Sequence, residues 1–215
     1  MSEPILSLIT RSLYVSSTAA LIAFVSAVAL SAILARVSKR RAEMVLGVFE
    51  ALVGIPTTVI GLFVYMLLYP RGPLGFMGLL YTPTAIIIGQ FFVALPMAFT
   101  SMFRSFYDLR GNVRELVLSL GCSEKCVNKV LLRELTPVLT SAYLLAFSRA
   151  IGELGVALIV GGGIEGYTNV LTTAIALRTS LGDYELAIQI GLILLALTIS
   201  LALMLKVFGE RVLWK

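Results

Sequence analysis

Residues 107–137 read YDLRGNVRELVLSLGCSEKCVNKVLLRELTP, and this charged stretch lies between two apolar runs that are each long enough to cross a bilayer. Apolar residues recur in it at helical spacings of three and four, at Val113, Leu116, Val117 and Leu120. Gly121 is expected to stop or bend this helix. A second amphipathic stretch then leads to Pro137, which suits the first turn of a new helix. The pattern predicts a helix–glycine–helix on the membrane surface that a soluble partner could bind. The alternative is a solvated loop that happens to be helical.

Composition places the chain among integral membrane proteins. Its 215 residues are 59% hydrophobic and 13% charged, and the mean hydropathy is +0.98. Spans use most of this length, so no second soluble domain is expected. The sequence has no histidine, which removes the commonest general base and metal ligand. Its two cysteines, Cys122 and Cys126, lack the partners of a metal site and are interpreted as reduced thiols.

Five apolar runs predict an all-α membrane protein with five transmembrane helices, in one domain over residues 10–208. The helices are expected at about 13–35, 44–69, 83–106, 137–160 and 186–207, with the charged loop at 107–136 between the third and fourth. The first run is too long for a signal peptide and is followed by basic residues rather than a cleavage site. The glycine-rich GGGIEG lacks the lysine of a phosphate-binding loop. We expect no catalytic site, no metal and no cofactor on this chain.

The basic residues predict the orientation. One side of the membrane would hold four in the first loop, six in the central loop and three in the tail, whereas the other holds only Arg11, Arg71 and Arg178. An excess of Lys and Arg marks the cytoplasmic face. The sequence therefore predicts a multi-pass protein of the cell membrane with the amino terminus outside, and the carboxyl terminus and central loop in the cytoplasm.

Polar residues inside spans are costly and usually face protein or water. Arg149 and Glu153 are four apart, so they can pair with each other and fix helix packing. Alternatively, Arg149 lies on a translocation path and attracts an anion. Neutral groups that could line the same path are Thr57, Thr58, Gln90, Thr100, Tyr143 and Ser148. Pro56 and Pro96 each predict either a packing kink or a bend that shapes the path.

The spacing of Glu115, Leu116, Val117 and Gly121 resembles the Glu-Ala-Ala…Gly loop of type I ABC importer permeases, with Leu116 and Val117 in place of the alanines. In that family the loop is the coupling helix, which fits a groove on the ATP-hydrolysing subunit. The resemblance implies a coupling role for the residues on and around the loop's glycine: Arg114, Glu115, Leu116, Val117, Gly121, Cys122 and Ser123. Arg133-Glu134 stands where many members have Leu-Pro.

Three further stretches narrow the resemblance to the molybdate, tungstate and sulfate branch. Residues 148–162, SRAIGELGVALIVGG, resemble its fourth core helix, and residues 52–90 and 169–187 resemble tungstate permeases. The resemblance implies a homodimer in the lipid bilayer, with two ABC ATPase subunits that hold ATP and Mg²⁺. An extracytoplasmic oxyanion-binding protein would deliver the substrate, and no nucleic acid is involved.

Other functions remain open from the sequence. Molybdate or sulfate could replace tungstate as the substrate. A self-sufficient secondary anion carrier would need inverted repeats and acidic coupling residues, and Glu153 is the one deep acid. A membrane scaffold would have no need of buried polar residues. A carrier would work alone in liposomes, whereas a permease would need its ATPase and binding protein.

Overall fold

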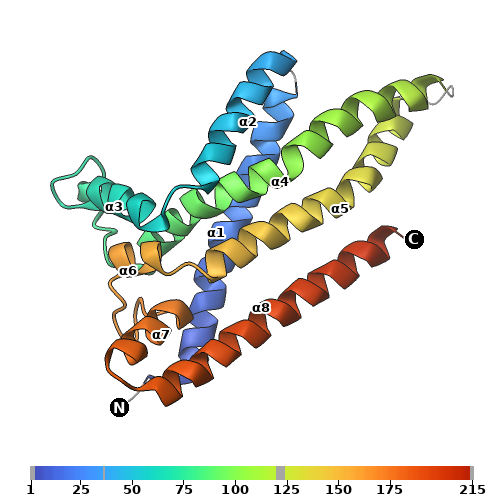
Figure 1. The fold of residues 1–215 in the computed structure, drawn as a ribbon. Helices are drawn as coiled ribbons and strands as arrows, with labels where there is room; N and C mark the ends of the chain where they lie inside the picture. Colours follow the sequence, from blue (N-terminus) through green and yellow to red (C-terminus); the bar gives the residue numbers. More distant parts are fainter. Residues whose placement is uncertain (1–2, 36, 120–123, 214–215) are drawn as a thin grey trace.

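A computed structural model describes residues 3–35, 37–119 and 124–213, and every regular element in these ranges is helical. Four long helices dominate Figure 1: α1 (Ile5–Leu34), α4 (Pro83–Ser119), α5 (Glu124–Ile151) and α8 (Tyr184–Leu213). The shorter elements are α2 (Lys39–Val53), α3 (Thr57–Leu68), the 3₁₀ turn η1 (Gly75–Met77), α6 (Gly155–Gly161) and α7 (Leu171–Ser180). The amino terminus lies beside α7, and the carboxyl terminus lies at the far end of α8.

Three helices in the described ranges are long and apolar enough to cross a membrane by themselves: Ile5–Leu34, Pro83–Ser105 and Tyr184–Met204. Two further candidates are bent pairs. Lys39–Val53 and Thr57–Leu68 meet at 99°, and Arg133–Ile151 and Gly155–Gly161 meet at 56°. The described residues therefore provide three spans, or up to five if each bent pair counts as one.

The helix boundaries differ from the sequence prediction in three places. The run at 44–69 is divided at residues 54–56, and the run at 137–160 is divided at 152–154. Pro137 lies inside α5 rather than in the first turn of a new helix. The predicted surface helices of the charged stretch are instead continuations of α4 and α5, because helical periodicity runs unbroken from each span into it.

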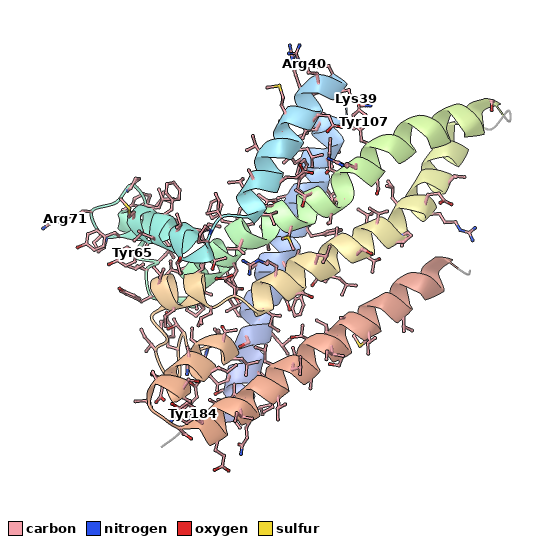
Figure 2. The ribbon with its side chains drawn as sticks, viewed as in Figure 1. Lys39, Arg40, Tyr65, Arg71, Tyr107 and Tyr184 are labelled. Carbon is pink, nitrogen blue, oxygen red and sulfur yellow. The ribbon has the colours of Figure 1, made fainter. Side chains whose placement is uncertain are left out.

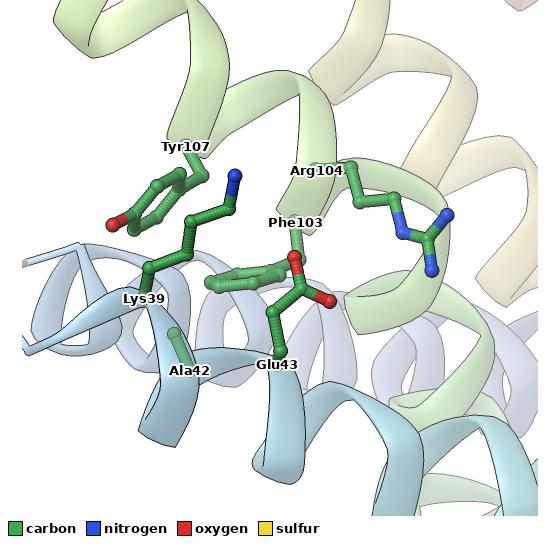
Figure 3. A pocket seen from close by; sticks show the side chains of 6 residues that line it. All are labelled: Lys39, Ala42, Glu43, Phe103, Arg104 and Tyr107. Atoms are coloured by element: carbon green, nitrogen blue, oxygen red, sulfur yellow. The ribbon is translucent and has the colours of Figure 1, made fainter.

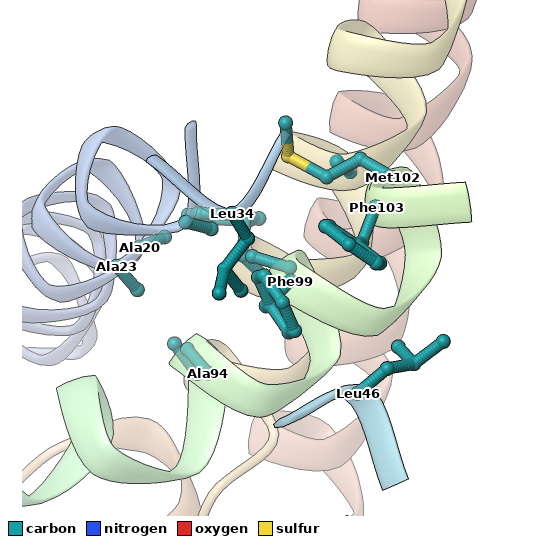
Figure 4. Packing of buried hydrophobic residues seen from close by; sticks show 14 of the residues in the cluster. Ala20, Ala23, Leu34, Leu46, Ala94, Phe99, Met102 and Phe103 are labelled. Carbon is teal, nitrogen blue, oxygen red and sulfur yellow. The ribbon is translucent and has the colours of Figure 1, made fainter. Parts of the chain in front are cut away.

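Small residues allow α1, α4 and α5 to pack closely at the centre of the fold. Alanines from each helix are fully buried there: Ala20, Ala23, Ala27, Ala94, Ala98, Ala142, Ala146 and Ala150. Within lipid, close contact between small side chains is a main source of helix association. Phe99 and Phe103 stack at 5.0 Å between ring centroids and, with Leu46 from α2, fill the wider end of this core (Figure 4).

A second core joins α3, α6 and the first half of α4. Val64, Ile86, Val93, Val156 and Val160 are buried together there. The loop that follows α3 is tied to this core, since the Tyr81 N–H donates to the Val160 carbonyl at 2.9 Å. The two cores meet along α4, so both broken helices are fastened to the same unbroken span.

Candidate translocation path and coupling segment

The two helix breaks lie against each other. Gly155 begins α6, and a Cβ atom built on it would lie 2.9 Å from Thr57 Oγ1 and 3.2 Å from the Thr58 backbone nitrogen. Thr57 begins α3. One turn further on, a Cβ on Gly61 would lie 3.1 Å from Val156 Cα. The starts of two interrupted helices therefore meet at backbone distance, and only residues without side chains permit this approach.

Glu153 holds the second break. Its side chain is 2% exposed, and its Oε2 accepts a hydrogen bond from Arg149 Nη1 at 2.8 Å. Its Oε1 accepts from the Val156 N–H at 3.1 Å, in the first turn of α6. The Thr172 hydroxyl on α7 donates to the Glu153 carbonyl oxygen at 2.9 Å. A carboxylate here satisfies a free N–H group of α6 and stabilises the positive end of that helix.

Arg149 differs from Glu153 in its exposure. Its side chain remains 32% exposed although it is paired. One nitrogen of the guanidinium contacts Glu153, and the group carries further N–H donors. The structure thus shows the ion pair that the spacing of four allowed. It also leaves part of a fixed cation accessible beside the helix break.

The other predicted path residues occupy varied positions. Thr57 is half-buried and Thr58 is exposed at the start of α3, close to Gly155. Gln90 is 1% exposed, and its Oε1 has no hydrogen-bond partner among the residues that the structure describes. The Thr100 hydroxyl donates to the Pro96 carbonyl at 2.8 Å, within its own helix.

Two path candidates on α5 complete the set. The Tyr143 ring packs edge-on against Phe24, with 5.8 Å between centroids, and Ser148 is half-buried. The structure therefore brings Thr57, Thr58, Arg149 and Glu153 to the junction of the two breaks. Gln90 and Thr100 lie on α4, and Tyr143 packs against Phe24. A path role for these residues stays a prediction.

Four of the predicted coupling residues, 114–117, lie in the last turns of α4. The α4–α5 pair extends beyond the other helices in Figure 1. The backbone at Arg114, Glu115, Leu116 and Val117 is helical, as part of α4. Gly121, Cys122 and Ser123 lie outside the described residues.

Sequence reasoning missed a polar cluster at the opposite end. Arg11 Nη1 donates to Glu3 Oε1 at 2.7 Å and to the Asn169 carbonyl at 2.6 Å. Asn169 Nδ2 donates to Glu3 Oε2 at 3.3 Å. The Ser12 hydroxyl accepts from the Leu171 N–H at 2.8 Å. These bonds fasten the start of α1 to the segment that enters α7, across more than 150 residues of sequence.

Hydrogen bonding decides the ionisation of Glu3. Burial raises the pKa of the Glu3 carboxyl, but this effect is outweighed by hydrogen bonds from Arg11, the Gly166 backbone and Ser7, and by the charge of Arg11. The net result is a pKa below its ordinary value. No local pattern could have predicted this cluster, because its partners are distant in the sequence.

Comparison with known proteins identifies the family. Residues 7–214 match the family described as "Binding-protein-dependent transport system inner membrane component". The chain belongs to this family. It is 38% identical over 196 residues to the tungstate uptake system permease protein TupB of Peptoclostridium acidaminophilum, covering 91% of this chain and 86% of that protein.

Two further relatives are also transport permeases, in agreement with the family assignment. TupB of Campylobacter jejuni is 35% identical over 154 residues, covering 72% of this chain and 64% of that protein. A probable anion ABC transporter permease protein of Haloferax volcanii is 33% identical over 174 residues, covering 79% of this chain and 75% of that protein. Sulfate transport system permeases are more distant, at 28% identity.

Proposed function

We propose that this permease forms the membrane path of an ATP-driven importer for tungstate. The observation that carries the proposal is the 38% identity to a tungstate uptake permease over 91% of the chain. Sulfate permeases share 28% over 61% of it. Tungstate, molybdate and sulfate are all tetrahedral oxyanions, so a related path could pass any of them, and tungstate is the substrate that the more similar relatives favour.

The proposed assembly has two copies of this chain, two ABC ATPase subunits and an extracytoplasmic oxyanion-binding protein. The ATPases bind ATP and Mg²⁺ and dock on the tip of the α4–α5 pair, around residues 114–123. The amino terminus is then outside and the carboxyl terminus cytoplasmic, as the distribution of Lys and Arg supports. Hydrolysis belongs to the ATPases, and this chain contributes the path.

In the proposed cycle, ATP binding draws the two ATPases together and moves the α4–α5 tips, which converts an inward-facing path to an outward-facing one. Differential binding of ATP to the two states drives the shift. Both helix breaks are fastened to α4 through buried side chains. Motion at the tip of α4 therefore has a packed route to the junction where Arg149 lies.

Arg149 is suited to a transient contact with an oxyanion. Its charge is largely balanced by Glu153 at 2.8 Å, so it attracts an anion without holding it tightly. Weak binding matters because release is part of transport. Helix interruptions also occur in secondary carriers. Family membership and the similarity to ABC permeases favour the ATP-driven mechanism over that alternative.

The test is uptake by proteoliposomes that contain the permease, its ATPase and its binding protein. ATP-dependent accumulation of tungstate is expected, and molybdate or sulfate at equal concentration should compete weakly. Uptake by the permease alone, driven by an ion gradient, would show a carrier instead. Stronger competition by sulfate than by unlabelled tungstate would move the substrate assignment to sulfate.

A further inference from the structure

A cavity of about 240 Å³ lies between the first turns of α2 and the middle of α4, away from both helix breaks. Six of the described residues line it: Lys39, Ala42, Glu43, Phe103, Arg104 and Tyr107. Figure 3 shows the Lys39 side chain extending between the Tyr107 and Phe103 rings. The Glu43 carboxylate lies beside the Phe103 ring, and the Arg104 guanidinium lies on the other side of Glu43. Liquid water occupies about 30 Å³ per molecule, so the cavity has room for a phosphodiester group.

The charges around this cavity favour an anion. Lys39 and Arg104 contribute two positive charges and Glu43 one negative charge, which leaves a net charge of +1 on the lining residues that the structure describes. Arg40 and Arg41 are exposed on the same turn of α2. Arg104 pairs with Glu50 at 3.2 Å, but their side chains are 65% and 50% exposed. An ion pair so exposed contributes little stability, so the Arg104 side chain is free to turn toward a bound anion.

Apolar sequence gives way to charged sequence around this cavity, which indicates the boundary between hydrocarbon and headgroups. On α4 the apolar run gives way to charged residues at Arg104, Asp108 and Arg110. On the neighbouring side, α1 ends at Leu34 just before the basic turn. Tyr107 has the amphipathic ring that membrane proteins concentrate at this boundary. Figure 2 places Lys39, Arg40 and Tyr107 together at one end of the molecule, far from Tyr184 at the other.

Apolar side chains continue from the basic turn toward the membrane interior. Met44 and Val48 follow Arg40 at successive turns of α2 and are 66% and 59% exposed. They provide an apolar surface beside the cavity along which acyl chains can lie. Basic pockets between membrane helices are suited to anionic lipid headgroups.

We propose that this cavity binds the headgroup phosphate of an anionic phospholipid. Lys39 and Arg104 contact the phosphate oxygens, and the Tyr107 hydroxyl donates a hydrogen bond to one of them. The lipid links α2, which ends at the first helix break, to α4, which packs in the central core. The inference is independent of the transported substrate and of which face is cytoplasmic.

The experiment is native mass spectrometry of the full chain in detergent, titrated with phosphatidylglycerol and with phosphatidylcholine of the same chain length. Wild type should bind phosphatidylglycerol more tightly. The Lys39→Gln/Arg104→Gln variant should lose this preference by about tenfold or more, since each basic residue near the membrane contributes roughly fivefold. Glu43→Gln should strengthen it, because a negative charge is removed from the lining.

Arg40→Gln is the matched control, because it removes a positive charge from the same turn without touching the cavity lining. A loss as large as that of the double variant would show a diffuse surface effect and overturn the site. If soluble glycerol 3-phosphate competes fully with phosphatidylglycerol, the cavity binds a free phosphate group and not a lipid, and the proposal is overturned. Displacement of phosphatidylglycerol by the ATPase would assign the cavity to a protein contact. If the double variant is not monodisperse, Lys39→Gln alone is compared with the wild type, and its preference for phosphatidylglycerol should fall about fivefold.

Discussion

Removing the charge on either side of the Arg149–Glu153 pair tests how the second helix break is held. The variants are Arg149→Gln, Glu153→Gln and the double substitution. Each glutamine keeps polar atoms in place while it removes the charge. The two positions are unequal, because the side chain of Glu153 is 2% exposed and that of Arg149 is 32% exposed. The variants should therefore differ in a defined order.

The exposures set the magnitudes. Arg149→Gln leaves a buried carboxylate without its counter-ion, which costs about 3 kcal/mol, the lower end of the usual range because the Val156 N–H still donates to it. Glu153→Gln leaves a cation that is one-third exposed, so its cost should be about 1 kcal/mol. The double variant leaves no unpaired charge and should cost about 1–2 kcal/mol. The coupling between the two sites is then about 2–3 kcal/mol.

The assay is unfolding in mixed detergent micelles, followed by circular dichroism, for the wild type and the three variants. Arg149→Gln should be the least stable of the four, and the double variant should recover part of the loss. Additive effects, or a larger loss from Glu153→Gln than from Arg149→Gln, would refute the reasoning that burial of the carboxylate dominates this pair.

Two further predictions concern packing and pH. Gly89→Ala should destabilise the fold by about 1–3 kcal/mol, because the added Cβ overlaps Val156 Cγ1; Gly47→Ala, with nothing within 4 Å, should be neutral or stabilising in the same unfolding assay. Equal losses would contradict the close α4–α6 contact. Glu3 has a lowered pKa, so its contribution to stability is present above its ordinary value of 4.5 and is lost as pH falls through the lower folded value. The melting temperatures of wild type and Glu3→Gln should therefore differ at pH 7 and converge below about pH 4.5; a gap that is unchanged at pH 3 would rule out the ionised tether to Arg11.

Apolar run length and periodicity predicted the long spans well. The runs at 13–35 and 186–207 lie almost wholly inside α1 and α8, and the third run begins at the first residue of α4. These helices are set by local hydrophobicity, which a single sequence displays. The all-helical architecture followed from the same signal.

The breaks were harder to predict. At Pro56 the sequence allowed either a packing kink or a bend that shapes the path. The two helices meet there at 99°, and a role of this bend in shaping the path stays a prediction. The sequence around the second break does contain residues typical of a helix interruption. Glycines at 152 and 155 flank Glu153, and an acidic residue stabilises the start of a helix. Whether such a pair of glycines breaks a helix depends on packing with Thr57 and Thr58, which lie about 100 residues away in the sequence.

The charged stretch shows the limit of periodicity. An apolar stripe with spacings of three and four predicted helix there, and helix is present through Ser119. Periodicity alone does not say whether such a helix is separate or continues a span. The Glu3–Arg11–Asn169 cluster could not be predicted either, because its hydrogen bonds join residues 158 and 166 positions apart.

The native cysteines allow the most direct test of the central claim, which is that the stretch around Gly121 is cytoplasmic and receives the ATPase. Cys122 and Cys126 are the chain's two cysteines, and both lie in this stretch. A membrane-impermeant maleimide should label them in inside-out vesicles but not in right-side-out vesicles, and the bound ATPase should protect them. A Cys122→Ser/Cys126→Ser variant gives the background. Labelling from the outer face, or labelling that the ATPase does not change, would contradict the account.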